Sequence, residues 1–280
     1  MKPRKRRTQI FLLMFLTATS VSVQSADNSA GYHPFLTNKF RLGVGVFTPL
    51  KRIKIQVDGT EPNSDIDFNQ ALDHSDSESI PALSFSWRYS KNWLLAGEYW
   101  SVGSRNGTVL TEDIEWEDGK LLAGSFVDSA VDTSIVRVFF GRSFLQDSPS
   151  QEFGLGAGLH WLNIKAFIEG DFDDGTSLEF RRENVNADIP LPNIGTWYIY
   201  SWSRKWMASA SLDWLNVSIG NYSGRLLNGQ VGVNYQISEI FGLGLSYSIF
   251  DTKIKVDNAG WRGAIETSQR GPLLLLTASW

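Results

Sequence analysis

Apolar and polar residues alternate along most of the chain beyond residue 38, and this is the pattern of β-strands whose two faces meet different surroundings. In residues 82–89, for example, Leu83, Phe85, Trp87 and Tyr89 alternate with alanine, serine and arginine. The same alternation recurs at 39–46, 93–100, 135–144, 153–161, 194–202, 206–214, 227–235, 241–249 and 274–280. These stretches predict ten antiparallel strands, an even number that places both chain ends on one side of the sheet.

At two places the pattern leaves alternatives open. Between residues 153 and 168 the apolar positions change from odd to even numbers after Trp161, which indicates either a β-bulge or the end of a membrane-spanning segment. Ile53, Ile55 and Val57 either extend the first strand or belong to a loop, so eight strands is the alternative count. Elsewhere, Asp118-Gly119 predicts a tight hairpin within the second long connection.

Aromatic residues on the apolar faces distinguish a membrane protein from a soluble β-sandwich. Phe153 and Trp161, like Trp206 and Trp214, lie eight residues apart on one face, which corresponds to about 20 Å of membrane depth for tilted strands. Two belts of aromatics are therefore predicted, with these membrane-interface anchors: Tyr89, Trp93, Trp161, Trp202, Trp206, Trp214, Phe241 and Trp280. The short connections near 90–92, 146–151, 203–205 and 238–240 are expected in the periplasm, and the longer ones outside the cell.

The last ten residues, GPLLLLTASW, place Leu274, Leu276, Ala278 and Trp280 on one face. In this respect the chain resembles the bacterial outer-membrane β-barrel proteins, whose final strand ends in an aromatic residue after alternating apolar positions. The resemblance covers residues 38–280. It implies an all-β, closed antiparallel transmembrane β-barrel in the outer membrane, in contact with outer-membrane lipids and lipopolysaccharide and assembled by machinery that reads the last strand. Pro272 departs from the usual pattern and puts the first ladder bonds of that strand in doubt.

Composition and charge place the protein outside the cytoplasm. Residues 1–25 combine a basic cluster with a short apolar run and predict a cleaved signal peptide, which leaves 26–280 as one barrel domain with acidic outer loops. The signal carries five of the 26 basic residues and none of the 30 acidic ones, so the mature chain is more acidic than the whole sequence, whose net charge is −4. This acidity argues against nucleic acid as a partner.

The chain contains no cysteine, which excludes disulfides, thiolate metal sites and a lipid-modified cysteine. The glycine runs GLGAGLH and GVGVF lack the spacing of a phosphate-binding loop, so inward glycines that let the barrel curve explain them better, and no cofactor is expected. The segment 58–78 carries seven acidic residues and no lysine or arginine, and whether such acidic loops bind divalent cations stays open.

Charged residues on the predicted inward face are the candidates for function. They need water or partners in a membrane protein, and they comprise Arg41, Arg88, Glu98, Arg137, His160 and Asp213. A polar network that fills a narrow barrel is the favoured interpretation, with a structural or surface-interaction role for the protein. The alternative is a small pore lined by Arg41, Arg88 and Arg137, which would prefer anions.

An outer-membrane enzyme acting on lipid A or peptides is the third hypothesis, because omptin proteases and lipid A deacylases share this architecture. Only three histidines are available: His33 precedes the first strand, His74 lies in the acidic first loop, and His160 is predicted to point inward. No local motif supplies a serine nucleophile or a pair of metal-binding histidines, so a non-enzymatic role is favoured and no catalytic residue is assigned. Substrate, surface ligand and oligomeric state are not encoded in a recognisable motif.

Overall fold

The computed structural model of the chain describes residues 31–57, 66–67, 72, 77–116, 119–145, 148–173, 175–219, 222–258 and 261–280. The predicted signal peptide lies outside these ranges, as do His74 and most of the acidic segment 58–78. Within the described ranges, no helix is long and apolar enough to cross a membrane.

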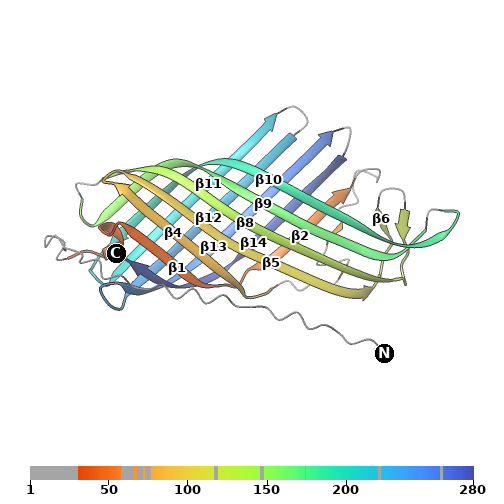
Figure 1. Cartoon of the computed structure of the whole chain (residues 1–280), viewed down its shortest axis with the longest axis horizontal. Helices are drawn as coiled ribbons and strands as arrows, with labels where there is room; N and C mark the ends of the chain where they lie inside the picture. The colour runs from red at the N-terminus through yellow and green to blue at the C-terminus, as the bar shows by residue number, and fades with distance from the viewer. Residues whose placement is uncertain are drawn as a thin grey trace, which may run out of the picture.

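Antiparallel strands pair side by side into a closed ring, because the last strand pairs with the first (Figure 1). The predicted all-β, closed antiparallel barrel is therefore confirmed. In the described part of the chain the ring contains ten strands: β1 (Phe40–Phe47), β4 (Ile80–Ser90), β5 (Trp93–Val109), β8 (Phe126–Phe144), β9 (Gln151–Asp173), β10 (Leu178–Ser201), β11 (Trp206–Ile219), β12 (Tyr222–Gln236), β13 (Phe241–Asn258) and β14 (Trp261–Ser279).

The first strand continues past an interruption at Thr48 and Pro49. Strand β1 pairs with residues 273–279 of β14, and β2 (Leu50–Val57) pairs with residues 263–270. Ile53 and Ile55 thus extend the first strand. The edge of β2 that does not pair with β14 pairs with β3 (Ile66–Asp67). Pro272 lies opposite the interruption, where the Thr48 N–H donates to its carbonyl oxygen at 2.9 Å. The doubt about its ladder bonds therefore holds on the β1–β2 side, whereas pairing with β13 is continuous.

One end of the barrel carries short turns and Trp280, and we call it the turn end; the opposite end, where β5, β8, β9 and β10 project, is the extended end (Figure 1). Strands β5 and β10 are 17 and 24 residues long, whereas about 9–11 residues suffice to cross a membrane. Beside the turn predicted at Asp118-Gly119, β6 (Ile114–Trp116) pairs with β7 (Gly119–Leu121) as a hairpin at the extended end, and residues 117 and 118 lie outside the described residues.

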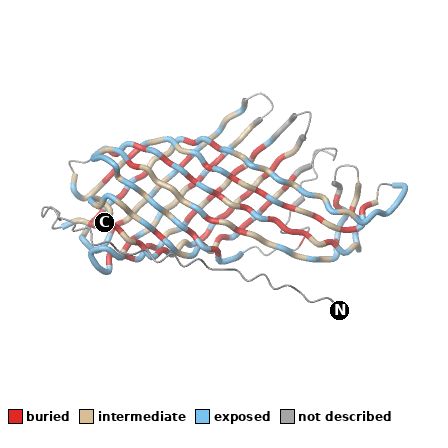
Figure 2. The backbone as a smooth tube through the Cα atoms, in the orientation of Figure 1, coloured by how far each residue is buried: buried red, intermediate tan, exposed pale blue. Residues whose placement is uncertain are grey.

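Part of the way along the barrel, the apolar residues of a strand change from its outer face to its inner, buried face. On β9, Leu155 and Trp161 are exposed on the outside, whereas Leu162, Ile164 and Ile168 are fully buried inside. The register of β9 with both neighbours is continuous through these residues, so the β-bulge interpretation is wrong. The burial pattern instead agrees with the other interpretation, the end of the membrane-spanning segment. Figure 2 shows buried and exposed residues alternating along the strands.

Strands β10 and β11 separate at the extended end. Their pairing ends at Ile194 and Trp214, and beyond that row, among the described residues, β10 pairs only with β9 and β11 only with β12. The backbone N–H of Ser201 points toward β9, where it donates to the Ser150 carbonyl. Successive N–H groups of a strand point to opposite sides, so the N–H groups of even-numbered residues in β10 point toward β11. Pro190 and Pro192 occupy two of these positions and carry no N–H, which explains why the pairing stops.

Candidate functional site in the barrel interior

A cluster of charged side chains crosses the middle of the barrel. Arg137 of β8 donates two hydrogen bonds to Asp213 of β11, from Nε at 2.6 Å and from Nη2 at 3.0 Å. Its Nη1 also donates to Oε1 of Glu98 on β5 at 3.2 Å. Arg137 and Asp213 are almost completely buried. Two carboxylates from separate strands thus share one arginine, and its pairing with Asp213 has the bidentate geometry that makes such pairs strong.

His160 of β9 belongs to the same cluster. Its Nδ1 atom lies 3.1 Å from Oδ1 of Asn193, and Asn228 Nδ2 lies 3.3 Å from its Nε2. Asn228 also donates to Oδ2 of Asp213 at 3.1 Å. The two asparagines escaped the sequence reasoning, because an uncharged amide in a strand does not stand out from its neighbours. The cluster holds His160 between amides and a carboxylate.

A second charged cluster lies nearer the turn end and contains a residue that the sequence reasoning missed. Arg88 of β4 forms an ion pair with Glu152 of β9. The same carboxylate accepts hydrogen bonds from Ser143 Oγ and from Trp197 Nε1, each at 2.8 Å. In the sequence, Glu152 shares the even-numbered positions of the inward glycines of β9. This position could have identified it as an inward charged residue.

Arg41 of β1 lies beside this second cluster but forms no ion pair with it among the described residues. It interacts electrostatically with Glu152 and Arg88, and its guanidinium carbon lies 5.5 Å from the Phe35 ring centre. Its Nη2 atom is buried and has no hydrogen-bond partner in the described part of the chain. The six predicted interior residues therefore divide into two groups: Glu98, Arg137, His160 and Asp213 in the first cluster, and Arg41 and Arg88 at the second.

Two inward glycines create the space for Trp197. A β-carbon on Gly154 would lie 2.1 Å from the Trp197 ring, and one on Gly141 would lie 2.5 Å from it. No side chain larger than hydrogen fits at these distances while the ring keeps its place. The position of the Trp197 ring therefore requires glycine at these two positions, which is a more specific reason than the curvature of the barrel. The Trp197 side chain extends past them and donates a hydrogen bond to Glu152.

The segment before β1 enters the barrel at the turn end. It includes the 3₁₀-helix η1 (Pro34–Leu36). His33 is completely buried, and its N–H donates to Ser201 Oγ at 2.9 Å. Burial lowers the pKa of His33 to about 4. Phe35 and Leu36 pack against a buried cluster on β5, β8, β10 and β11, which consists of Leu94, Phe139, Trp197, Ile199 and Met207.

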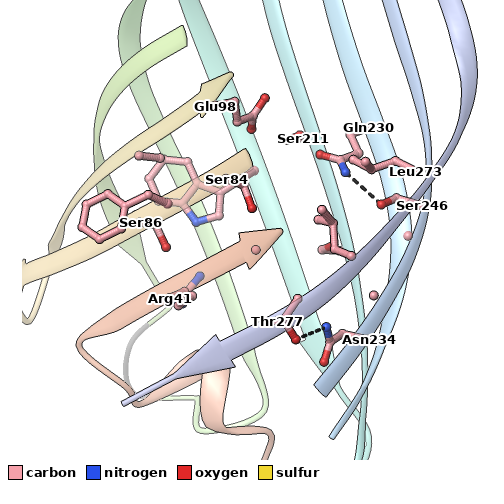
Figure 3. A pocket seen from close by; sticks show the side chains of 18 of the residues that line it. Arg41, Ser84, Ser86, Glu98, Ser211, Gln230, Asn234, Ser246, Leu273 and Thr277 are labelled. Atoms are coloured by element: carbon pink, nitrogen blue, oxygen red, sulfur yellow. Dashed lines mark hydrogen bonds between the residues drawn. The ribbon is translucent and has the colours of Figure 1, made fainter. Parts of the chain in front are cut away.

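A cavity of about 240 Å³ lies between the two charged clusters (Figure 3). Apolar side chains line one part of it: Phe35, Leu94, Phe139, Ile199 and Met207. Small and hydroxyl-bearing residues line another part, including Ser84, Ser86, Ser211, Ser246 and Thr277. Charged residues also belong to the lining: Arg41 beside the second cluster, and Glu98 and Arg137 of the first.

Beyond the first cluster, apolar side chains fill most of the interior of the extended end, with a few buried polar ones such as Thr133, Thr267 and Gln269. Its largest fully buried side chains include Phe172 of β9, Phe250 of β13 and Ile55 of β2. They belong to one contiguous core that also contains Leu162, Ile164, Ile168, Leu191 and Leu226. Side chains, most of them apolar, therefore fill this half of the barrel, as in a small closed β-barrel.

The outer surface of the other half carries the predicted membrane-interface anchors. All eight of these aromatic residues are between 36% and 50% exposed. Several contact other aromatic rings near the turn end: the ring centres of Trp206 and Tyr235 lie 4.7 Å apart, and those of Trp280 and Phe40 lie 5.7 Å apart. Between the belts the exposed side chains are apolar, for example Leu243 and Leu245 of β13.

Acidic residues at the extended end pair locally. Asp113 forms an ion pair with Lys120 at 2.8 Å and accepts the Ala123 N–H at 2.7 Å, and both contacts lower its pKa. In the described part of the chain, no group of three or more histidine and acidic side chains is arranged to hold a metal ion. Most of the acidic segment 58–78 lies outside the described residues.

A closed antiparallel ring with an apolar, aromatic-bordered outer band and charged side chains inside defines a class of protein: this is a β-barrel of the bacterial outer-membrane type. No family model and no curated protein matches the chain.

Among solved structures, the chain is similar to the toluene transporter TodX of Pseudomonas putida, with 8% identity over 89% of this chain and 92% of that chain and a TM-score of 0.35. It is also similar to the outer membrane protein OprG of Pseudomonas aeruginosa, with 12% identity over 91% and 99% and a TM-score of 0.37. A third is the translocator domain of the autotransporter NalP from Neisseria meningitidis, with 9% identity over 86% and 88% and a TM-score of 0.40.

Proposed function

We propose that this protein resides in the bacterial outer membrane with its turn end in the periplasm, and that its lumen does not conduct ions. Its role is then structural, or is exerted through the strands that project from the membrane. One observation carries this proposal: side chains occupy the interior at three successive levels. They are the segment around η1, the Arg137 cluster and the apolar core.

The apolar core is the strongest of the three barriers. An ion would have to leave water to pass between fully buried side chains such as Phe172, Phe250 and Leu162, and transfer of a charge into such surroundings costs many kcal/mol. Two of the three arginines that a pore would need are engaged as well, because Arg88 pairs with Glu152 and Arg137 with Asp213. This arrangement favours a plugged barrel over an anion-preferring pore.

Single-channel conductance in a planar bilayer tests the proposal. Wild-type protein that is folded and inserted is expected to give no steady current. Arg88→Ala should also be silent, because the other two levels remain in place. Arg204→Ala is the matched control, since Arg204 lies exposed at a turn and pairs only loosely with Glu239 at 3.6 Å. Steady wild-type conductance whose ion preference changes in Arg88→Ala, but not in the control, would establish the pore instead.

The extended end offers a polar outer surface for contacts outside the cell. Arg105 forms an ion pair with Asp128, and Arg182 forms one with Glu169 at 3.5 Å. Both guanidinium groups lie over the Phe167 ring, with their central carbons 5.5 Å and 3.5 Å from its centre. Two exposed arginines beside one aromatic ring support a contact with lipopolysaccharide phosphates, which guanidinium groups bind through paired hydrogen bonds.

Lipopolysaccharide retention tests this contact. The variant Arg105→Gln/Arg182→Gln should retain less lipopolysaccharide than wild type when both are purified from the same membranes. Arg204→Gln/Glu239→Gln at the turn end should retain as much as wild type. Equal retention by all three proteins would remove these arginines from the proposed contact and leave the conductance result unaffected.

A further inference from the structure

Basic residues gather on one side of the barrel, where the outer apolar band ends toward the extended end. The strands on this side are β12, β13, β14 and β2, which follow one another around the ring (Figure 1). Beyond the band, the first outward polar residue is Arg225 on β12, Arg270 on β14 and Arg52 on β2. The corresponding residues of β5, β8, β9 and β11 carry no charge: Ser101, Ser134, Asn163 and Asn216. The three arginines therefore mark one side of the barrel at the level where the membrane ends.

The three arginines line one groove of about 500 Å³, together with Lys253 of β13. Two carboxylates share this groove, and each has a basic partner. Asp251 accepts hydrogen bonds from Nε and Nη2 of Arg270, at 3.2 and 2.5 Å, and Glu266 pairs with a lysine at 2.9 Å. These bonds do not use Nη1 of Arg270, whose side chain is 53% exposed. Arg225 is exposed and forms no ion pair in the described part of the chain, so the groove has an excess of positive charge.

The outer surface between this groove and the turn end is apolar. Leu274 of β14 pairs with Val46 and with Leu245, and Leu245 pairs with Val233. These four side chains, which we call the apolar row, face outward and are between 42% and 54% exposed. Tyr247 borders both surfaces, because it follows Leu245 on the outer face of β13 and also lines the groove. A ligand that combines apolar chains with an anionic headgroup would contact both surfaces, whereas a soluble phosphate would contact the groove alone.

The width of the groove distinguishes between lipid headgroups. Arg225 and Arg52 belong to strands that are three places apart in the ring, and each place corresponds to about 4.8 Å. The single phosphate of a phospholipid cannot reach both arginines, but two phosphates on a pair of sugars can. Guanidinium groups bind such phosphates through paired hydrogen bonds.

We propose that this groove binds the headgroup of a diphosphorylated glycolipid of the lipid A type. One phosphate pairs with Arg225, the other pairs with Arg52 and Arg270, and the acyl chains pack on the apolar row. The proposal rests on the outer-membrane location and the orientation proposed above, which place the groove at the outer leaflet. It adds a second contact with lipopolysaccharide, on other strands than the contact proposed for Arg105 and Arg182.

Binding of three lipids to the folded wild-type chain tests the proposal. The chain is purified in detergent without lipopolysaccharide, and bound lipid is counted by native mass spectrometry. Diphosphoryl lipid A is expected to bind about tenfold more tightly than monophosphoryl lipid A or phosphatidylglycerol, because only diphosphoryl lipid A engages both ends of the groove. Equal binding of the three lipids would overturn the proposal.

Substitutions of Arg225 assign one of the contacts. Arg225→Gln takes away no ion pair in the described part of the chain and should weaken binding of diphosphoryl lipid A about tenfold. Arg225→Lys keeps the charge but not the paired donors, and it should retain part of the affinity that Arg225→Gln loses. Arg204→Gln, at an exposed turn, should bind this lipid like wild type. Unchanged binding in Arg225→Gln would place the lipid elsewhere.

A gain of binding keeps the test decisive if another variant folds poorly. Asp251→Asn removes the carboxylate that competes with phosphate for Arg270, so this variant should bind diphosphoryl lipid A more tightly than wild type. A general loss of structure cannot produce such a gain. Equal or weaker binding by folded Asp251→Asn would contradict the proposal.

A separate experiment tests the orientation on which the proposal rests. The chain contains no cysteine, so Thr176→Cys places a single reactive thiol in the exposed connection between β9 and β10 at the extended end. Labelling of this thiol by an impermeant maleimide on intact cells is expected. Labelling without a preference for diphosphoryl lipid A overturns the groove proposal alone, whereas that preference without labelling overturns the proposed orientation alone.

Discussion

Asp213→Ala should destabilise the barrel far more than removal of an exposed charge. The substitution takes away the acceptor of two of the three hydrogen bonds that Arg137 donates, and one that Asn228 donates. The Arg137 side chain is only 8% exposed, so water cannot replace the lost carboxylate. Removing one partner of a buried ion pair typically costs about 3–5 kcal/mol, and we expect a loss in this range.

The assay is equilibrium unfolding in urea from detergent micelles, followed by tryptophan fluorescence. The double variant Arg137→Met/Asp213→Leu removes both buried charges of this pair and should recover part of the loss. Glu98 also loses its contact with Arg137, but 26% of its side chain is exposed. Arg204→Ala should cost less than about 1 kcal/mol, as exposed ion pairs usually do. A loss below about 1 kcal/mol for Asp213→Ala, or a double variant as unstable as the sum of the single variants, would refute this account of the cluster.

Three further predictions concern the turn end and the separated strands. Gly154→Leu displaces the Trp197 ring and should lower the free energy of unfolding by about 3 kcal/mol in the same titration. Burial lowers the pKa of His33 from its usual 6.5 to about 4, so docking of residues 33–36 should be complete above pH 6.5 and weaken as the pH falls toward 4. Protease cleavage near η1 should rise over this interval in wild type and not in His33→Gln. The backbone amide of Asn216 points toward β10 beyond the last paired residues, whereas that of Leu215 points toward its partner strand β12. Hydrogen exchange at Asn216 should therefore be about 100-fold faster than at Leu215. Equal exchange rates would mean that β10 and β11 pair beyond Trp214.

The strands that cross the membrane could be predicted because lipid imposes a simple rule on them. An outward side chain must be apolar while the inward one is free to be small or polar, so alternation marked β4, β11 and β13 directly. Closure also followed, since an open edge in lipid would leave backbone groups without partners. These inferences need only local sequence and the chemistry of the surroundings.

Residues 178–193 of β10 were not predicted as a strand, because their polar side chains face outward and their apolar ones face inward. Arg182, Asn184 and Asn186 are exposed there, and Val185 is half-buried against the inner core, so a search for apolar outward positions passes over them. Pro190 and Pro192 also argue against a central strand. They are tolerated because they lie on an edge that β11 does not cover in the described part of the chain.

The pairing of the interior charges could not be predicted, although their inward direction could. Arg88 and Glu152 are 64 residues apart, and Arg137 and Asp213 are 76 apart. Neither pair comes from neighbouring strands of the ring. Which side chains meet across a lumen depends on strand number, tilt and stagger together, and alternation along one strand contains none of these.

The reversal of apolar and polar faces occurs at the same level on neighbouring strands, and this coincidence identifies its cause. Val136 on β8 and Trp161 on β9 are paired and exposed outside, while the next pair, Ile135 and Leu162, is fully buried inside. A fault in one strand would shift its register against the next, yet the pairing is continuous. The change must therefore come from outside the barrel, where lipid gives way to water. Once the outer face no longer needs apolar residues, the strands place them inside, and the lumen becomes mainly apolar at the level where the membrane ends.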